Sequence, residues 1–532
     1  MVIEKSFKVN KNIKQKNSKK RIVIISDTHM SPSGEAFNQK AFDQGINKIN
    51  AIKDVTLYIH LGDLTQSGTL LDYEFALEQF KKFKPELNAE LRCLIGNHDS
   101  LNVGYLLFEE MISKRYFEFE DEYLYVTGID STKPDLAGGI IHRNIIEAVR
   151  KRLEKPERKD KFKIVCFHHQ LIPIPNTGKE RSAIDDSGNV LKMLIDAKAD
   201  LVLNGHRHIS NIYTVSSSEK DLYIFNSGTF CCNKTRYREL FTYNIIDIEG
   251  KKINFKVIPI YDSDYKKEIS REVNYYAPVV LAKNRKLICK FIQIANSFIS
   301  EHSEDKVTSL DRSIKMINNI KNVDLVIHSG NVTKNSFKNE FIIAKEKLNN
   351  LTRPYIVIPG YSDSKPSSSN LWERFIGPSD PLYENDRLYF QGIDSTTPDS
   401  KTGFIGRQKL NSFIDKVLNL SHQKIIGVSC FHSLIPTPLS VWRTELIDSG
   451  DVLSQFARSQ VDLVLNSSPS ISFNAKIEHT IFSNGGNLEG THFDETFVEI
   501  DIYKNGLMIL IEHDLNSGKK KVIGSYYITI FK

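Results

Sequence analysis

Short apolar segments recur along the first half of the chain, and each runs into a polar turn that carries His, Asp or Asn. These segments are Arg21–Ser26, Leu57–Leu61, Arg92–Ile95, Phe162–Phe167 and Asp200–Leu203. A short apolar run closed by turn residues is typical of a buried strand. Amphipathic segments between them, such as Tyr73–Lys82 and Ile145–Leu153, predict helices. Alternating strands and helices predict an α/β fold, whose sites gather at the carboxyl ends of the strands.

The pattern occurs twice along the chain, which indicates a tandem duplication. Four segments return in order with small changes: Ile59–Thr65 as Ile327–Thr333, Gly128–Thr132 as Gly392–Thr396, Cys166–His168 as Cys430–His432, and Asp200–Asn204 as Asp462–Asn466. A period this long predicts two complete domains rather than a solenoid. Each copy ends in a strand-rich portion, Leu222–Ser227 and Phe241–Ile258 in the first and Phe497–Glu512 in the second.

The repeat sets the expected domain boundaries. We predict a flexible basic leader over residues 1–20, a first domain over 21–262, a linker over 263–284 and a second domain over 285–532. The predicted linker is polar and contains a break at Tyr275–Pro278. The leader is rich in Lys, so it is either a solvated extension or an attachment point for a polyanion.

Composition indicates an ordinary soluble protein. The 532 residues are 40% hydrophobic and 26% charged, and no run approaches the roughly 18 apolar residues of a membrane span. Six scattered cysteines do not form a disulfide framework, which favours the cytoplasm. The adjacent Cys231 and Cys232 have no metal-binding spacing, so we expect no thiolate metal site. A net charge of +6 gives little indication of nucleic acid as a partner, although it does not exclude one.

The turns after the five strands of the first copy supply a set of metal-binding side chains. The candidates are Asp27, His29, Asp63, Asn97, His168, His206 and His208. Imidazole with carboxylate and amide oxygen suits Mn, Fe, Co, Ni or Zn better than Mg or Ca. Seven groups are too many for one such ion. Two divalent transition-metal ions that share one carboxylate would use all seven.

The motif order DxH, GD, GNHD, H and GHxH resembles the calcineurin-like metallophosphoesterase superfamily. The run Gly62–Gly68 followed by Tyr73 and Glu74 is most similar to its class III cyclic-nucleotide phosphodiesterase branch. The resemblance implies an αββα sandwich, here in two tandem copies, with two metals at the strand ends. It implies that one metal is held by Asp27, His29 and His208, the other by Asn97, His168 and His206, with Asp63 as the bridge.

The resemblance also implies a reaction. A metal-bridging hydroxide would hydrolyse a small phosphodiester, such as a cyclic nucleotide, while His98 contacts the scissile phosphate. Physical chemistry agrees, because His98 could supply a proton to the leaving oxygen. Asp99 would orient an imidazole from outside the ligand set. His169 either lines the substrate cleft or is a satisfied internal histidine, and Arg207 is either a substrate contact or a solvated side chain.

The second copy lacks this chemistry. The positions equivalent to six of the seven ligands and to His98 hold other residues, namely Asn296, Phe298, Asn331, Tyr361, Ser362, Ser468 and Ser470, and only His432 is retained. One imidazole does not hold two metals, so we predict a metal-free second domain with a structural or regulatory role. Two fused copies would reproduce a homodimer interface as an intramolecular pseudo-dimer.

Two other functions remain open on the sequence. A nuclease of the same superfamily would keep GNHD, but the chain shows neither a DNA-binding cap region nor a concentrated basic face beyond the leader. A non-catalytic interaction scaffold on the same fold is favoured by the degenerate second copy and opposed by the complete first copy.

Overall fold

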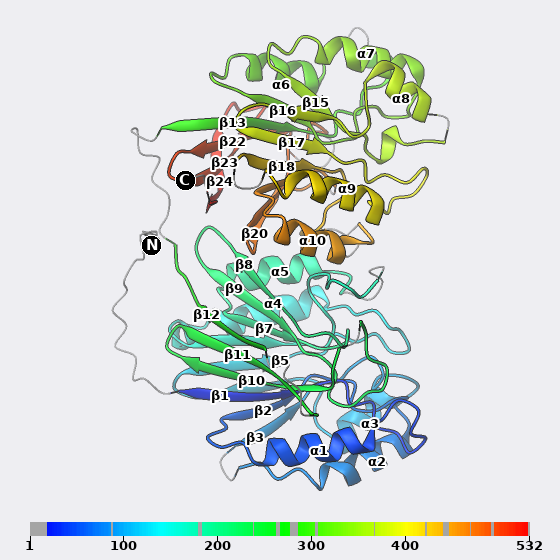
Figure 1. Ribbon diagram of the computed structural model, residues 1–532, viewed down its shortest axis with the longest axis vertical. Helices are drawn as coiled ribbons and strands as arrows, with labels where there is room; N and C mark the ends of the chain where they lie inside the picture. Colours follow the sequence, from blue (N-terminus) through cyan, green and yellow to red (C-terminus); the bar gives the residue numbers. More distant parts are fainter. Residues whose placement is uncertain are drawn as a thin grey trace. The chain divides into compact units, whose positions relative to one another are not determined.

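The computed structural model describes residues 19–86, 89–178, 184–237, 239–261, 267–276, 286–303, 307–366, 368–420, 423–439, 446–468, 470–490 and 494–529. The chain divides into two compact units that change over near residue 277 (Figure 1). The predicted leader lies outside the described residues except for its last two positions. Residues 263–266 and 277–284 of the predicted linker also lie outside them. In the described part of the chain, no helix is long and apolar enough to cross a membrane.

The described strands of the first unit lie in two sheet layers, with six strands in each. Their strand orders are β12-β11-β10-β1-β2-β3 and β8-β9-β7-β6-β5-β4. The strands are β1 (Lys20–Ile25), β2 (Leu57–His60), β3 (Glu90–Cys93), β4 (Phe117–Glu120), β5 (Leu124–Gly128), β6 (Phe162–Cys166), β7 (Leu201–Asn204), β8 (Asn211–Ser216), β9 (Asp221–Asn226), β10 (Thr242–Glu249), β11 (Lys252–Pro259) and β12 (Lys267–Glu272). Within each sheet, parallel pairs form the site-bearing part: β1, β2 and β3 in one, and β5, β6, β7 and β9 in the other.

The two sheets of the first unit pack face to face and carry helices on their outer faces. The helices are α1 (Gln39–Asn50), α2 (Leu70–Phe80), α3 (Gly104–Met111), α4 (Arg143–Leu153), η1 (Pro156–Arg158) and α5 (Ser187–Asp196). In β1, Ile22 and Ile24 join the core between the sheets, whereas Val23 and Ile25 pack among α1, α2 and α3. Alternate residues of a strand face opposite sides. A strand covered on both sides must therefore be apolar throughout, which explains its continuous apolar run.

The second unit repeats this architecture. Its sheets have the orders β15-β14-β13-β22-β23-β24 and β16-β17-β18-β19-β21-β20. The strands are β13 (Leu287–Ile294), β14 (Leu325–His328), β15 (Tyr355–Val357), β16 (Leu382–Glu384), β17 (Leu388–Gly392), β18 (Ile425–Ser429), β19 (Leu463–Asn466), β20 (Phe473–Ile477), β21 (Thr480–Asn484), β22 (Thr496–Tyr503), β23 (Leu507–Asp514) and β24 (Lys520–Tyr527).

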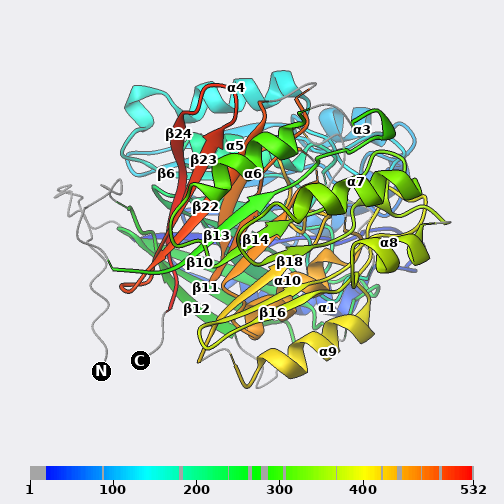
Figure 2. The ribbon, with the colours of Figure 1, turned by 90° about the horizontal axis from the view of Figure 1, so that it is seen from above.

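Helices again cover the sheets of the second unit. They are η2 (Glu301–Ser303), α6 (Ser309–Asn318), α7 (Lys338–Leu348), η3 (Tyr361–Asp363), α8 (Ser369–Phe375), α9 (Arg407–Val417) and α10 (Ser449–Arg458). Figure 2 shows α6 and α7 lying over β13 and β14, where their apolar side chains join one core cluster. Both units thus have the αββα layering that the sequence predicted.

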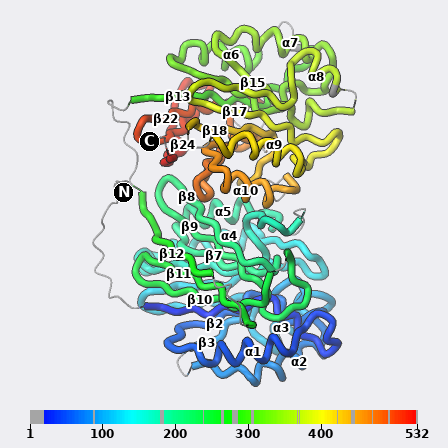
Figure 3. The backbone as a smooth tube through the Cα atoms, in the orientation of Figure 1, coloured from blue at the N-terminus to red at the C-terminus, as the bar shows by residue number. Residues whose placement is uncertain are grey.

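The strand-rich end of each unit completes its first sheet. In the first unit, β10 pairs antiparallel with β1 although they are distant in sequence, and Figure 3 shows the two segments side by side.

The predicted linker over 263–284 was wrong in part. Lys267–Glu272, placed in the predicted linker, form β12 and pair with β11. Their exposed and half-buried residues alternate, as on an edge strand with one solvated face, and this polar pattern reads in sequence like a linker.

A buried carboxylate fixes the turn after β3 in the first unit. Asp99 accepts hydrogen bonds from the backbone N–H groups of Gly96, Leu64 and Thr65 at 2.9, 3.0 and 2.7 Å, and from the Thr65 hydroxyl at 2.9 Å. These contacts join the turns after β2 and β3. Asp99 therefore contacts backbone amides and a hydroxyl, and not the imidazole that we expected it to orient.

The second unit keeps this arrangement. Asp363 accepts from the backbone N–H groups of Gly360, Val332 and Thr333 at 2.9, 2.9 and 2.7 Å, and from the Thr333 hydroxyl at 2.7 Å. The same contacts occur in a copy without the ligand residues. They therefore stabilise the fold independently of metal binding.

We predict that Asp363→Ala destabilises the second unit by about 3 kcal/mol or more, since it leaves three buried N–H groups without an acceptor. The chain has only two tryptophans, Trp372 and Trp442, and both lie in the second half. Tryptophan fluorescence during urea unfolding therefore reports on that unit. The exposed Asp386→Ala is the control and should change stability by less than about 0.5 kcal/mol. Equal midpoints for the two variants would contradict the anchoring role.

Candidate metal centre

The predicted ligands occupy the turns that follow β1, β2, β3, β6 and β7, at the carboxyl ends of parallel strands. Backbone hydrogen bonds tie these turns together: the Asp27 N–H donates to the Gly62 carbonyl and the His29 N–H to the Asp63 carbonyl, both at 3.0 Å. A side chain at Gly62 would meet the Nδ1 atom of His168 at 2.7 Å, and the residue has a φ of +98°. Gly62 therefore permits the close approach of the two sheets at the site.

Five of the seven candidate ligands have a left-handed backbone. The φ angles are 52° at Asp27, 49° at His29, 52° at Asp63, 71° at His206 and 56° at His208. Each such residue costs roughly 1–2 kcal/mol relative to the ordinary helical region. The surrounding hydrogen bonds must offset that cost, and the result is a set of side chains that all turn toward one edge.

The first group of donors comprises Asp27, His29, Asp63 and His208, whose ligand atoms lie within 4.8 Å of one another. All four residues are buried. The Nε2 atoms of His29 and His208 are 3.2 Å apart. Nε2 of His208 lies 3.3 Å from Oδ1 of Asp27, and Nε2 of His29 lies 3.5 Å from Oδ2 of Asp63.

The second group comprises Asp63, His168 and His206, again within 4.8 Å. Oδ2 of Asp63 lies 3.3 Å from Nε2 of His168. Asn97 joins this group through its Oδ1 atom, which is 3.2 Å from Nε2 of His168 and 2.9 Å from Nδ1 of His206. Asp63 is thus the one carboxylate common to both groups.

Hydrogen bonds to backbone carbonyls orient two of the rings. Nδ1 of His168 donates to the Leu61 carbonyl at 2.8 Å, and Nδ1 of His208 donates to the Lys234 carbonyl at 2.7 Å. The neutral form of each ring therefore presents a lone pair at Nε2, toward carboxylate or amide oxygens. When these rings are neutral, electron-pair donors converge on one point, so the residues fit a metal ion.

Burial keeps two of the imidazoles neutral. It lowers the pKa of His29 to about 3. The pKa of His206 is also well below its ordinary value, because of burial and of the adjacent His169 and His168. Neutral imidazole is the form that binds a metal, so these two rings need not lose a proton first.

The other two imidazoles balance the buried carboxylates. Burial opposes charge on His168 and His208, but Asp63 raises the pKa of His168 to about 9 and Asp27 raises that of His208 to about 10. Conversely, burial would raise the pKa of Asp63, yet the neighbouring imidazoles hold it well below its ordinary value. Two carboxylates and two imidazolium ions form a neutral cluster, and divalent cations can replace the two protons.

Comparison with known proteins agrees with this geometry. A family model described as calcineurin-like phosphoesterase matches residues 20–210, which include all seven candidate ligands. The first unit carries a calcineurin-like phosphoesterase domain. This family is metal-dependent, and the buried His and Asp groups of the domain can bind metal.

Two relatives of the phosphoesterase domain have phosphodiesterase names. A probable cyclic nucleotide phosphodiesterase from Xenorhabdus bovienii is 23% identical over 43% of this chain and 95% of that protein. A probable glycerophosphodiester phosphodiesterase from Arcobacter nitrofigilis is 28% identical over 29% of this chain and 58% of that protein. The solved structure of a purple acid phosphatase from yellow lupin (Lupinus luteus) is 11% identical, with a TM-score of 0.32, over 58% of this chain and 62% of that one.

His98 lies at the edge of the metal-capable groups of the phosphoesterase domain. Its ring is half-buried and meets that of His29 edge to face at a centroid distance of 4.5 Å. Its backbone N–H donates to Oδ1 of Asp63 at 2.8 Å, and its Nδ1 donates to the Gln66 carbonyl at 2.7 Å. The ring is fixed in place, and its Nε2 atom is the one available for proton transfer.

Two further residues have internal contacts. His169 is fully buried, its Nδ1 lies 2.8 Å from the Ser131 hydroxyl, and its ring packs on His206 at 4.7 Å between centroids. Its burial favours an internal position over the substrate cleft, but the ring is only partly satisfied, because its Nε2 atom has no hydrogen-bond partner among the described residues. Arg207 is also buried, and its guanidinium donates to the Thr177 carbonyl at 2.8 Å. Its burial argues against the solvated side chain that we considered.

The second unit has uncharged polar groups where the ligands would be. Nδ2 of Asn331 donates to Oδ1 of Asn296, and Nδ2 of Asn296 donates to the Ser470 hydroxyl, both at 3.0 Å. Oδ1 of Asn331 accepts from the backbone N–H of Ser362 at 3.0 Å, as Asp63 does from His98. The side chains therefore satisfy one another without a cation.

The expectation that His432 retains one ligand was wrong. His432 bonds to the Ser395 hydroxyl at 2.9 Å, as His169 does to Ser131, so it is the equivalent of His169. The residue equivalent to His168 is Phe431, which faces Gly330 as His168 faces Gly62. All seven ligand positions are thus changed in the second unit.

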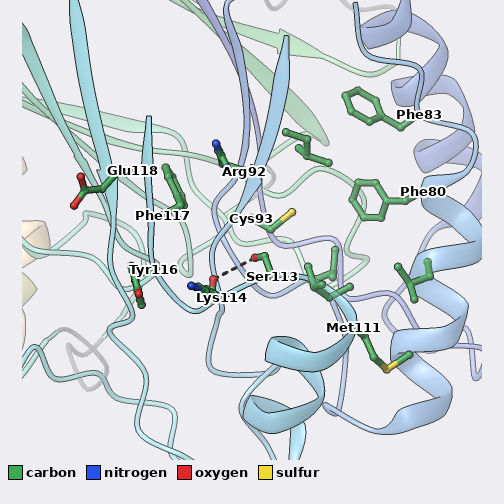
Figure 4. Close-up of a pocket in the computed structure, with 14 residues that line it drawn as sticks. Phe80, Phe83, Arg92, Cys93, Met111, Ser113, Lys114, Tyr116, Phe117 and Glu118 are labelled. Atoms are coloured by element: carbon green, nitrogen blue, oxygen red, sulfur yellow. Dashed lines mark hydrogen bonds between the residues drawn. The ribbon is translucent and has the colours of Figure 1, made fainter. Parts of the chain in front are cut away.

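An apolar pocket of about 560 Å³ lies elsewhere in the phosphoesterase domain (Figure 4). Its lining comes from α2, β3, the end of α3 and β4, and includes Phe80, Cys93, Met111 and Phe117. None of the seven candidate ligands lines it. It therefore does not contribute to the metal centre.

We predict that Asp63→Asn removes most of the bound metal, because both groups of donors share this carboxylate. Elemental analysis after loading with Mn or Zn should fall from about two equivalents to less than about half of one. The equivalent position in the second unit provides the control: Asn331→Ala should leave metal content unchanged. Loss of metal in Asn331→Ala, with normal tryptophan fluorescence, would show that the second unit takes part.

Proposed function

We propose that the chain is a dimetal-dependent phosphodiesterase that hydrolyses small phosphodiesters, with cyclic nucleotides and glycerophosphodiesters as the substrate class. The observation that carries the proposal is the pair of buried donor groups with Asp63 in common. The names of the two relatives support the substrate class. The seven ligands accept Mn, Fe, Co, Ni or Zn, so these residues by themselves do not select one metal.

Bound metals would supply neutralisation of the phosphate oxygens and a lowered pKa for an attacking water. The chain's own residues would hold the two ions in position and donate a proton. Asp27, His29 and His208 would hold one ion and Asn97, His168 and His206 the other, with Asp63 between them. Their buried, hydrogen-bonded rings keep this arrangement before substrate arrives, so little reorganisation is needed during the reaction.

His98 would donate the proton that the leaving oxygen needs. Because Nδ1 donates to the Gln66 carbonyl, its hydrogen stays in place in both charge states of the ring. The transferable proton is therefore the one on Nε2 of the imidazolium. His98 is not among the metal-capable donor groups, so it can change charge without loss of an ion.

We further propose that the second unit binds no metal and does not catalyse. Phe298, Phe431 and Tyr361 place aromatic rings at three of the ligand positions. At the positions equivalent to Asp63 and Asp27, Asn331 and Asn296 form a neutral hydrogen bond with each other. Such a unit would serve the protein through its surface, in a structural or regulatory role.

We expect His98→Ala to keep its metal and to lower the turnover of bis-p-nitrophenyl phosphate by about 10²–10⁴-fold if a general acid is lost. The exposed His142→Ala serves as the control and should retain normal turnover. Metal analysis accompanies each assay. A His98→Ala protein that loses its metal, or that turns over normally, would end this assignment.

Substrate class is tested with Mn-loaded protein and its Asp63→Asn variant as the blank. The panel consists of 3′,5′-cyclic nucleotides, glycerophosphodiesters and single-stranded DNA. We expect turnover of at least one small phosphodiester and none of DNA. Turnover of DNA alone would identify a nuclease, and absence of all turnover in a fully loaded protein would favour an interaction scaffold.

A further inference from the structure

The adjacent cysteines of the phosphoesterase domain face different surroundings. Cys231 joins the core beneath α1, and its thiol donates to the Thr28 carbonyl at 3.5 Å. The thiol of Cys232 lies within 4.8 Å of a ring nitrogen of His29 and of one of His208. Both cysteines are fully buried. The pair has no metal-binding spacing in the sequence, yet one thiol lies beside the first group of donors.

Hydrogen bonds tie the segment of Cys232 to the metal-capable turns. Its backbone N–H donates to the Thr229 hydroxyl at 2.9 Å, and that hydroxyl donates to the carbonyl of Asp27 at 2.7 Å. The same segment is held by the Phe230 N–H, which donates to the Ser26 carbonyl at 2.8 Å. The thiol is therefore fixed beside Asp27 rather than placed there by a free loop.

The other cysteines lie in different environments. All six are described by the structure, and among them only Cys232 belongs to a group of metal-capable donors. Cys93 lines the apolar pocket of Figure 4. In the second unit, the pairing of β21 with β19 matches that of β9 with β7, which makes Gly490 the equivalent of Cys232. The unit without the ligands thus also lacks the thiol.

We propose that Cys232 supplies a thiolate ligand at the metal position formed by Asp27, His29 and His208. The inference rests on the proposed dimetal site and deepens it. On binding, the metal–sulfur bond forms as the S–H bond breaks, and the proton passes to solvent. The two metal positions would then differ in chemistry: one would have nitrogen, oxygen and sulfur donors, the other only nitrogen and oxygen. Thiolate favours Zn over Mn, so the sulfur-containing position selects the softer ion.

The test uses the full-length protein loaded with Co²⁺, whose bond to thiolate gives a charge-transfer absorption in the near ultraviolet. The wild type should show this band together with about two equivalents of cobalt. Cys232→Ser should lose the band and keep most of its cobalt, because the other donors remain. Cys231→Ser and Cys93→Ser are the matched controls and should retain the band.

Competition between Zn and Mn gives a second measurement. Cys232→Ser should lower the preference for Zn over Mn by about 10-fold or more, a usual size for loss of a group at a metal site. Wild-type protein that binds two equivalents of cobalt without the band overturns this inference and leaves the dimetal proposal intact. A band that persists in Cys232→Ser does the same. Absence of any cobalt uptake overturns the proposed dimetal function itself.

Discussion

The buried carboxylate of Asp63 is the group on which the rest of the site depends. A carboxylate that is removed from water is costly unless positive charge or hydrogen-bond donors surround it. Here Oδ1 accepts the backbone N–H of His98, while Oδ2 lies near His29 on one side and His168 on the other. Both sheets must therefore deliver their donors to the same point. The turns, the left-handed residues and the close approach at Gly62 all serve this requirement.

The second unit keeps the same turns without a carboxylate at the position equivalent to Asp63. Asn331 takes the place of Asp63 and forms neutral hydrogen bonds with Asn296 and with the backbone of Ser362. The Asp363 anchor persists, so the turns keep their form. Fold and metal chemistry are therefore separable in this chain, because the contacts that fix the backbone differ from those that would hold an ion.

Much of the fold and site followed from the sequence for a physical reason. The carboxyl ends of parallel strands meet at one sheet edge, so short apolar runs that end in His, Asp or Asn predict a shared site. Short stretches of identical sequence were a less reliable guide to the alignment of the two copies. Identical Cys-Phe-His triplets suggested that His432 matches His168, but the hydrogen bond to Ser395 shows a shift of one residue. A one-residue shift along a strand exchanges its two faces, and sequence identity over three residues does not detect it.

The sequence patterns did not predict contacts between residues that are distant in sequence. Cys232 is distant in sequence from His29, and it returns to the site only because β9 lies parallel to β7. The sequence did not predict the role of Asp99, because three of its four hydrogen bonds come from backbone amides, which every residue except proline possesses.

The left-handed turns of the second unit match those of the first. Asn296, Phe298 and Asn331 keep positive φ angles of 55°, 42° and 55°, close to those of Asp27, His29 and Asp63. The same backbone conformation thus occurs in both units, although the second has other residues at the positions equivalent to the seven ligands. Placing the ligand side chains in the second unit would therefore require no new loop. The second unit keeps the backbone conformation of the first at these turns. Protein engineers could build a different ion site on that backbone.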